Sequence, residues 1–360
     1  MRRELRLVTA VGLSFALLPA QQTFVVGTGG THPTITAAIA AAAAGDTVLV
    51  IGGSHYDNLD IDKGINLISR GASLGLSLFG QSRIHDIPVG QTFTMSGFTA
   101  DPSQLSPTLT IRDCGGLVAL DRLAASQTRW YLAAQNCRQL HVADCGLGEV
   151  TTVDTTAIFT SCVIRPVLGG PMDATRSRIA AVACRVPNLA LVGQAFRLFD
   201  SDLAMTRCDI DTTSSLTWAT GIPVLTYGSC AVVLDPDNVF WPNTAAPVQG
   251  SAAVATQPIT STVAASDGQR LTTVTHGAAG TAFITLLSLP IPAATTPLGL
   301  LWLDLPHAII VDAGVLSANR LQVANLPHPT LPAGLTVALQ SAYLAGNNFV
   351  LGLPTIAIAP

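Results

Sequence analysis

Residues 34–71, TITAAIAAAAAGDTVLVIGGSHYDNLDIDKGINLISRG, join an alanine-rich segment to a short valine-rich run and then to a loop that contains a tyrosine. Thr34 follows a proline and can accept a hydrogen bond at the start of a helix, while Gly45 can end it. Ile35 and Ile39 are four residues apart and therefore share one face of that helix. The run at 47–51, TVLVI, predicts a strand directly after it.

One hypothesis for this order is a nucleotide-binding unit, because a strand-like TFVV and the sequence GTGG precede the helix. The glycine spacing opposes it: Gly27 and Gly29 fit the pattern, but His32 occupies the place of the third glycine. Residues 1–20 oppose it as well. A basic start, an apolar core and a small residue at Ala20 predict a signal peptide, and therefore a secreted, cell-surface or periplasmic protein.

The composition excludes further classes. Only 11% of the residues are charged, the net charge is −4, and Lys63 is the only lysine, so a nucleic-acid surface is not expected. No later apolar run is long enough for a membrane helix, so an integral membrane protein is not expected. Abundant Ala, Val, Leu and Thr favour a β-rich body with a long core.

The seven cysteines are spaced regularly. Their separations are 23, 8, 17, 22, 24 and 22 residues, each close to a multiple of eight. A fixed period of this kind predicts a solenoid, and a sub-period near eight predicts a coil with three faces. We expect one structural ladder of six stacked cysteines, with Cys145 on the next face; the ladder comprises Cys114, Cys137, Cys162, Cys184, Cys208 and Cys230. A leucine-rich repeat is the alternative, but it does not explain the eight-residue offset of Cys145.

The opening stretch also carries a family pattern. The order T-I-x-x-A-I-x-x-A-x-x-G-D-T-V-x-V is matched by Thr34, Ile35, Ala38, Ile39, Ala42, Gly45, Asp46, Thr47, Val48 and Val50. With a looser continuation through Gly53, Tyr56, Asp60 and Lys63, residues 31–71 resemble the N-terminal segment of the pectin-lyase-like, right-handed parallel β-helix family. The resemblance implies a helix that caps the first coil. It also implies relatives that degrade acidic polysaccharides, either with Ca²⁺ and an arginine or lysine base or with clustered aspartates.

Aligned coils test for such a site. The positions that flank the six cysteines do not stack two acids. The alignment instead predicts the ion-pair columns Asp154–Arg176–Asp200 and Arg178–Asp202. Calcium remains an alternative, with Asp200, Asp202, Asp209 and Asp211 as candidate ligands; no other cofactor is expected. Asp235 and Asp237 lie in a turn-like DPDN, and Trp130 with Tyr131 could stack on a sugar or simply pack. No catalytic residue can be assigned.

The domain organisation follows from where the cysteines stop. We expect an all-β chain with a right-handed parallel β-helix and N-terminal helical cap over 21–243, a linker over 244–269 and a small β-sandwich over 270–360. Residues 297–304 and 331–342 resemble a C-terminal module of exported planctomycete-type proteins. The sequence favours a non-catalytic surface or carbohydrate-interacting role, with a polysaccharide or cell-surface component as partner. The alternative is a lyase or glycoside hydrolase that acts on an acidic polysaccharide.

Overall fold

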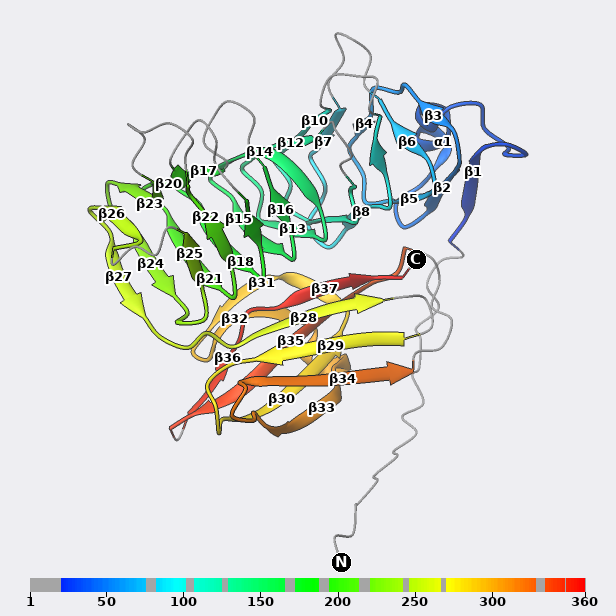
Figure 1. The fold of residues 1–360 in the computed structure, drawn as a ribbon. Helices are drawn as coiled ribbons and strands as arrows, with labels where there is room; N and C mark the ends of the chain where they lie inside the picture. Colours follow the sequence, from blue (N-terminus) through cyan, green and yellow to red (C-terminus); the bar gives the residue numbers. More distant parts are fainter. Residues whose placement is uncertain are drawn as a thin grey trace, which may run out of the picture.

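The computed structural model describes residues 21–75, 82–101, 107–124, 129–165, 172–187, 194–213, 221–241, 246–266, 270–327, 334–346 and 348–359. The first part is a parallel β-solenoid of about eight turns, and a smaller antiparallel β domain lies along one side of it (Figure 1). The predicted signal peptide lies outside the described residues. Among the described residues, no helix is long and apolar enough to cross a membrane.

The single α-helix of the described chain is α1 (Ile35–Ala41). It begins as predicted: the Thr34 hydroxyl accepts a hydrogen bond from the Ala37 N–H at 3.1 Å. Ile35 and Ile39 are buried and belong to the solenoid core, so the apolar face of the helix packs inward. That this helix caps the solenoid remains a prediction.

Each solenoid coil has three faces, and the first face is a continuous parallel sheet. Its strands, in spatial order, are β1 (Thr23–Gly27), β2 (Thr47–Ile51), β5 (Asn66–Arg70), β8 (Thr92–Ser96), β11 (Leu117–Asp121), β13 (Gln139–Ala143), β15 (Thr156–Thr160), β18 (Arg178–Val182), β21 (Asp202–Thr206), β24 (Ala231–Leu234) and β27 (Ala253–Thr256). Along each strand alternate side chains point into the core, as the period of two requires.

The other two faces share one long strand, β14 (Gly146–Val153), which runs across both. The second face holds β3 (Ser54–His55), β6 (Ser73–Leu74), β9 (Thr99–Ala100), the start of β14, β16 (Val163–Ile164), β19 (Arg185–Val186), β22 (Asp209–Asp211) and β25 (Val239–Trp241). The third face holds β4 (Asp60–Ile61), β7 (Ser82–His85), β10 (Thr108–Arg112), β12 (Trp130–Gln135), the end of β14, β17 (Met172–Thr175), β20 (Gln194–Phe199), β23 (Ile222–Tyr227) and β26 (Val248–Gly250).

The chain turns sharply at two corners of each coil. In most coils the residue at the turn is not glycine, and there it has a left-handed backbone with φ between 46° and 54°. At the first corner, between the third and first faces, these residues are Asp86, Asp113, Asn136, Asp154, Arg176 and Asp200; at the second corner, between the first and second faces, they are Arg122, Asp144, Ser161, Ala183 and Arg207. The residue after each turn points into the core.

The cysteines occupy that inward position, but the prediction of one column of six is wrong. Strand register places Cys114, Cys137 and Cys230 at the first corner, and Cys145, Cys162, Cys184 and Cys208 at the second. The number of residues between strands differs from coil to coil, so the same separation can lead to the same corner or to the other one. All seven are free thiols and buried.

Hydroxyls replace the thiols in the middle of the first corner. The Cys137 N–H donates to the Thr155 hydroxyl, the Thr155 N–H to Ser177, and the Ser177 N–H to Ser201, at 3.0–3.3 Å. The Ser201 N–H in turn points to the Cys230 sulfur at 3.5 Å. This column ties five successive coils together through side chains as well as strands.

The C-terminal domain is antiparallel. Its strands form a three-stranded sheet, a five-stranded sheet and a hairpin: β28 (Ser261–Ser266), β29 (Arg270–His276) and β34 (Leu321–Pro327); β33 (Ile309–Val315), β30 (Ala282–Ser288), β35 (Thr336–Ala345), β36 (Asn348–Leu351) and β37 (Thr355–Ile358); β31 (Pro290–Thr296) and β32 (Gly299–Leu303). A 3₁₀ turn, Leu305–His307, precedes β33. Ala264 and Leu271 of one sheet and Leu339 of the other share one hydrophobic cluster, while the complete sandwich remains a prediction.

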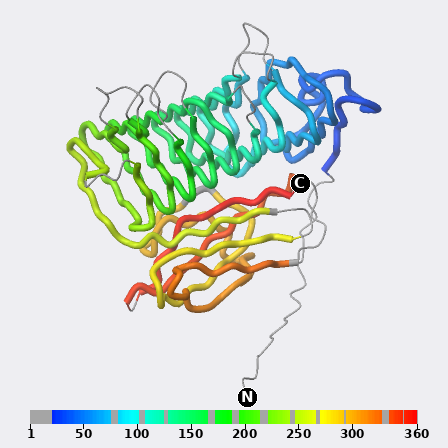
Figure 2. The backbone as a smooth tube through the Cα atoms, in the orientation of Figure 1, coloured from blue at the N-terminus to red at the C-terminus, as the bar shows by residue number. Residues whose placement is uncertain are grey.

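This domain covers the outer side of the first face (Figure 2). Ile68 and Ala119 of the solenoid pack against Ile356 and Ile358 of β37. Farther along, Trp302 of β32 is fully buried against the solenoid residues Ile158 and Ala180. Leu300 and Leu353 of the C-terminal domain pack against the same cluster. The first face is therefore a packed interface between the two parts of the chain.

The segment 244–269, for which the sequence suggests a linker, contains strands. β26 and β27 pair with β23 and β24 and extend the solenoid, and β28 begins the C-terminal domain. Small residues such as Ala, Val and Thr do not show whether a neighbouring strand is available to pair with. That partner is supplied by the preceding coil and is not encoded locally.

We predict that all seven thiols are inaccessible to a thiol reagent in the folded protein and that seven react after unfolding. Burial raises the pKa values of the Cys162 and Cys208 thiols well above their ordinary range, which adds to the steric protection. Titration with an aromatic disulfide reagent, with and without denaturant, tests this. Fewer than seven reactive thiols after unfolding would indicate disulfides and contradict the structure.

Candidate functional site

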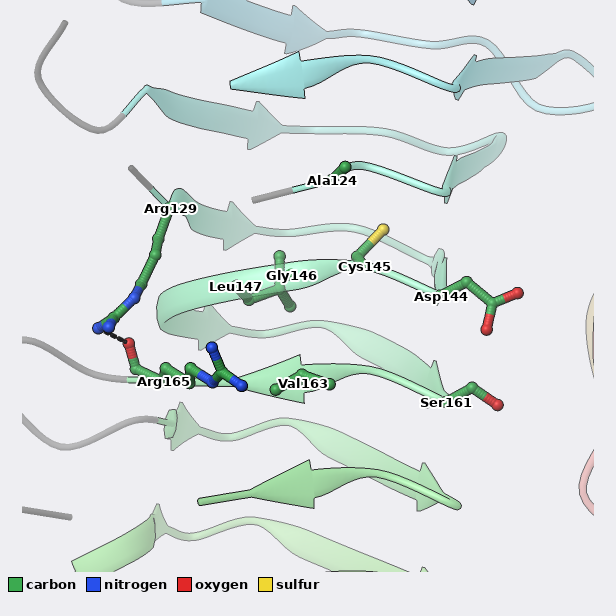
Figure 3. Close-up of a pocket in the computed structure, with 9 residues that line it drawn as sticks. All are labelled: Ala124, Arg129, Asp144, Cys145, Gly146, Leu147, Ser161, Val163 and Arg165. Carbon is green, nitrogen blue, oxygen red and sulfur yellow. Dashed lines mark hydrogen bonds between the residues drawn. The ribbon is translucent and has the colours of Figure 1, made fainter. Parts of the chain in front are cut away.

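A shallow cavity of about 360 Å³ lies on the second face. Its lining residues come from successive coils; they are Ala124, Arg129, Asp144, Cys145, Gly146, Leu147, Ser161, Val163 and Arg165 (Figure 3). Between Cys145 and Cys162 the coil is only 17 residues long, because β14 runs across two faces without an inserted loop. The adjoining full coils have 22 or 24 residues, so the cavity lies where the short coil leaves space.

One end of the cavity is positively charged. The Arg129 guanidinium donates from Nη1 to the backbone carbonyl oxygen of Arg165 at 2.5 Å, so two arginines line this end of the cavity (Figure 3). Arg165 is exposed and Arg129 is half-buried. Each arginine carries a guanidinium group with several N–H donors, which suit carboxylate or other anionic oxygens.

The other end holds Asp144 and Ser161, both in left-handed corner conformations. The pKa of Asp144 is raised to about 6, first by desolvation and then by the nearby Asp121 carboxylate, while Arg122 opposes the shift. Burial also raises the pKa of Asp121, although its carboxylate accepts hydrogen bonds from Arg122 at 2.7 Å and from Ser96 at 2.9 Å. Asp144 lines the cavity and is exposed, whereas Asp121 is buried and is not among the lining residues. A carboxyl group with a raised pKa beside a cavity is typical of functional sites.

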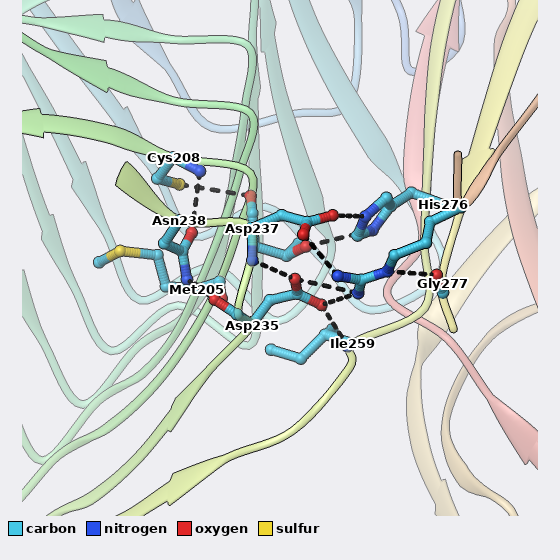
Figure 4. Close-up of polar contacts among 10 residues, drawn as sticks. Met205, Cys208, Asp235, Asp237, Asn238, Ile259, His276 and Gly277 are labelled. Carbon is cyan, nitrogen blue, oxygen red and sulfur yellow. Dashed lines mark hydrogen bonds and ion pairs between the residues drawn. The ribbon is translucent and has the colours of Figure 1, made fainter. Parts of the chain in front are cut away.

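A second polar cluster joins the two parts of the chain. The turn after β24 contributes Asp235, whose side chain is fully buried, and Asp237, while the C-terminal domain contributes His276 and Arg320 (Figure 4). Arg320 lies 3.1 Å from the Asp235 carboxylate and 2.5 Å from that of Asp237. His276 Nε2 is 2.7 Å from Asp237 Oδ2.

This cluster is built as a clamp. Asp235 also accepts hydrogen bonds from the backbone N–H groups of Asp237 and Ile259, at 2.9 and 2.6 Å. One ligand atom each from Asp235, Asp237 and His276 lie within 4.8 Å of one another, a donor set that could hold a metal ion. The Arg320 guanidinium already supplies positive charge to both carboxylates, so the arrangement is satisfied by protein groups alone.

The predicted calcium ligands have separate partners. Asp202 pairs with Arg178 at 3.9 Å and Asp209 with Arg185 at 3.3 Å, while Asp200 accepts from the Ser229 N–H at 2.8 Å. Asp211 accepts from the Thr213 N–H and hydroxyl. The structure distributes the four over the first corner, the first face and the second face, and calcium binding there remains a prediction.

Two further predictions concern side-chain roles. The Arg176–Asp154 pair is confirmed as a bidentate contact with both distances at 2.7 Å. The Arg178–Asp202 pair is confirmed as a single, longer contact at 3.9 Å. The packing interpretation of Trp130 is confirmed: it is fully buried and its Nε1 donates to the Ala124 carbonyl. Tyr131 remains partly exposed on the third face.

The sequence did not identify either cluster as a site. The sequence places Asp235 and Asp237 in a turn, which is correct. Their partners are distant in sequence: His276 lies 39 residues from Asp237, and Arg320 lies 85 residues from Asp235. For the cavity, a signal was available: the 17-residue cysteine separation marks the one short coil in the series.

No protein-family model matches the chain, and no curated protein matches it. The resemblance to the pectin-lyase-like family therefore rests on the quoted residues, and the fold supports it only at the level of a parallel β-solenoid.

We predict that Arg320→Ala lowers the free energy of unfolding by about 3 kcal/mol or more, because it leaves the buried Asp235 carboxylate without its counter-charge. Urea denaturation measures the change. Arg178→Ala, which breaks an exposed pair, is the control and should cost about 0.5 kcal/mol or less. Equal losses in the two variants would show that the cluster does not clamp the domains.

The burial of His141 predicts that the protein loses stability in acid. Its side chain is buried beneath the C-terminal domain, and desolvation lowers its pKa from 6.5 to about 3. The unfolded chain then binds the proton more readily, so stability falls as pH drops below about 6.5, by about 2 kcal/mol at pH 5. We expect His141→Leu to lose less stability between pH 7 and pH 5 than the parent protein in thermal unfolding.

His85 provides a control of opposite sign. Its pKa is raised, first by its hydrogen bond to Asp86, so its contribution to stability is present at low pH and is lost as pH rises through the folded pKa. His85→Gln should therefore make the protein relatively more acid-sensitive. If His141→Leu and the parent protein respond equally to acid, the burial of a neutral His141 is not what limits stability.

Proposed function

We propose that the protein is a secreted carbohydrate-binding solenoid and that the cavity of the second face binds acidic saccharide units. The observation that carries this proposal is that two arginines, Arg129 and Arg165, line one end of the cavity. Arginine side chains bind carboxylates through paired, charge-assisted hydrogen bonds. Sugar hydroxyls find a further partner in the Ser161 side chain.

The shape of the cavity supports a polymeric ligand. It is shallow, and its lining mixes charged and polar side chains with small residues such as Ala124 and Gly146. Sites for small apolar molecules are instead enclosed and mostly apolar. The first face is buried under the C-terminal domain, so a long polymer has access to the second and third faces only.

A catalytic role is the second candidate, and Asp144 is the observation that favours it. A carboxyl group with a pKa of about 6 is partly protonated at neutral pH and can donate a proton to a leaving group. In a hydrolase this residue would be the general acid at the end of the cavity opposite the arginines. Asp121 is the nearest perturbed carboxyl group, but its oxygens are held by Ser96 and Arg122.

Binding and turnover can be measured on one panel of substrates. We expect the purified mature protein to be retained by a polyuronate and not by a neutral glucan, with retention weakened by salt. Arg165→Ala should weaken binding about tenfold or more, because it removes charge-assisted hydrogen bonds. The exposed Arg138 lies outside the cavity lining, so Arg138→Ala makes the same charge change and should leave binding almost unaltered.

The same samples, assayed for new reducing ends and unsaturated products with and without Ca²⁺, separate the two candidates. Retention without products supports the binding role. Products that disappear in Asp144→Asn would establish the catalytic role instead. Equal retention of polyuronate and neutral glucan, or equal binding by Arg165→Ala and Arg138→Ala, would exclude the cavity as an acidic saccharide site.

A further inference from the structure

The last coil of the solenoid has open strand edges on all three faces. Among the described residues, β25 pairs only with β22, β26 only with β23 and β27 only with β24. Figure 1 shows β26 and β27 at the end of the stack of coils. An unpaired edge presents a row of backbone N–H and C=O groups that another strand can bind.

The hydrophobic core is also open at this end. Val254 stands in register with Val232, which points into the core and is fully buried, yet Val254 is 52% exposed. Val248 follows the fully buried Val224 in the same way and is only partly buried. In the last coil, the apolar side chains at core positions are therefore at least partly exposed to solvent.

No charge protects this surface. Residues 238–266, which include β25, β26 and β27, contain no Asp, Glu, Lys, Arg or His. Natural sheets block association at open edges with charged side chains, especially lysine, or with a covering segment. A terminal solenoid coil usually needs a polar outer surface for solubility. The absence of charge in 238–266 means that nothing repels an identical surface.

We propose that this open end, formed by β25, β26 and β27, is a self-association surface on which the same end of a second copy docks. A two-fold axis beside β27 places its open edge antiparallel to the same edge of the second copy and brings Val254 close to Val254 of that copy. The other end of the solenoid is an unsuitable partner, because there α1 packs its apolar residues Ile35 and Ile39 against the core. Docking of like ends closes after two copies and gives a dimer.

Sedimentation velocity of the purified mature protein over a range of concentrations tests this proposal. We expect a concentration-dependent dimer, and we expect Val254→Lys to raise its dissociation constant by about a hundredfold or more, because two lysines would meet at the two-fold axis. Thr256→Lys places a charge on an exposed position of the same strand and should act in the same direction. Unchanged thermal unfolding of the dilute variants shows that they are folded.

Val89→Lys is the matched control. Val89 is 64% exposed in a turn of the solenoid far from the last coil in sequence, so its substitution should leave the dimer intact. Hydrogen exchange of the β27 amides should also slow with concentration in the parent protein and not in Val254→Lys. A protein that stays monomeric at all concentrations, or a dimer that tolerates both lysines on β27, would overturn the proposal.

Discussion

Every regular coil of the solenoid depends on a residue held in the left-handed region of backbone space. For residues with a side chain this conformation costs about 1 kcal/mol or more, and it occurs at both corners of successive coils. Hydrogen bonds between coils support it: the Asp113 N–H donates to the Gln135 carbonyl and the Ser161 N–H to the Val182 carbonyl, at 3.0 and 2.9 Å. Each coil thus holds its neighbour's strained turn in place, and the next residue is directed into the core, where Cys, Thr or Ser fits.

The same corners decide where chemistry can occur. A left-handed turn directs its own side chain outward, which places Asp144 and Ser161 at the rim of the cavity. The C-terminal domain then removes the first face from solvent and buries His141 between the two parts. Its clamp at Asp235 and Arg320 holds charged groups that neither part could bury alone. The fold therefore leaves the second and third faces and the open end of the solenoid available for partners.

The sequence predicts features whose causes are local or periodic. The helix start at Thr34 follows from its own neighbours, and the Arg176–Asp154 pair follows from a repeat of 22 residues. The cysteine columns show where periodicity fails. A separation of 22 residues connects Cys162 to Cys184 at one corner, yet the same separation connects Cys208 to Cys230 at different corners. Because the number of residues between strands varies from coil to coil, two cysteines with the same separation in sequence can lie at the same corner or at different corners.

The sequence by itself determined that the chain forms a parallel solenoid with inward cysteines and a second β-rich part, because alternation and period are properties of consecutive residues. Only the tertiary structure decided which corner each cysteine occupies, that residues 248–256 continue the solenoid, and that Asp235 meets Arg320. These features depend on which strand is available as a neighbour and on contacts across up to 85 residues. Such contacts are set by the packing of whole coils and domains, and no local pattern encodes them.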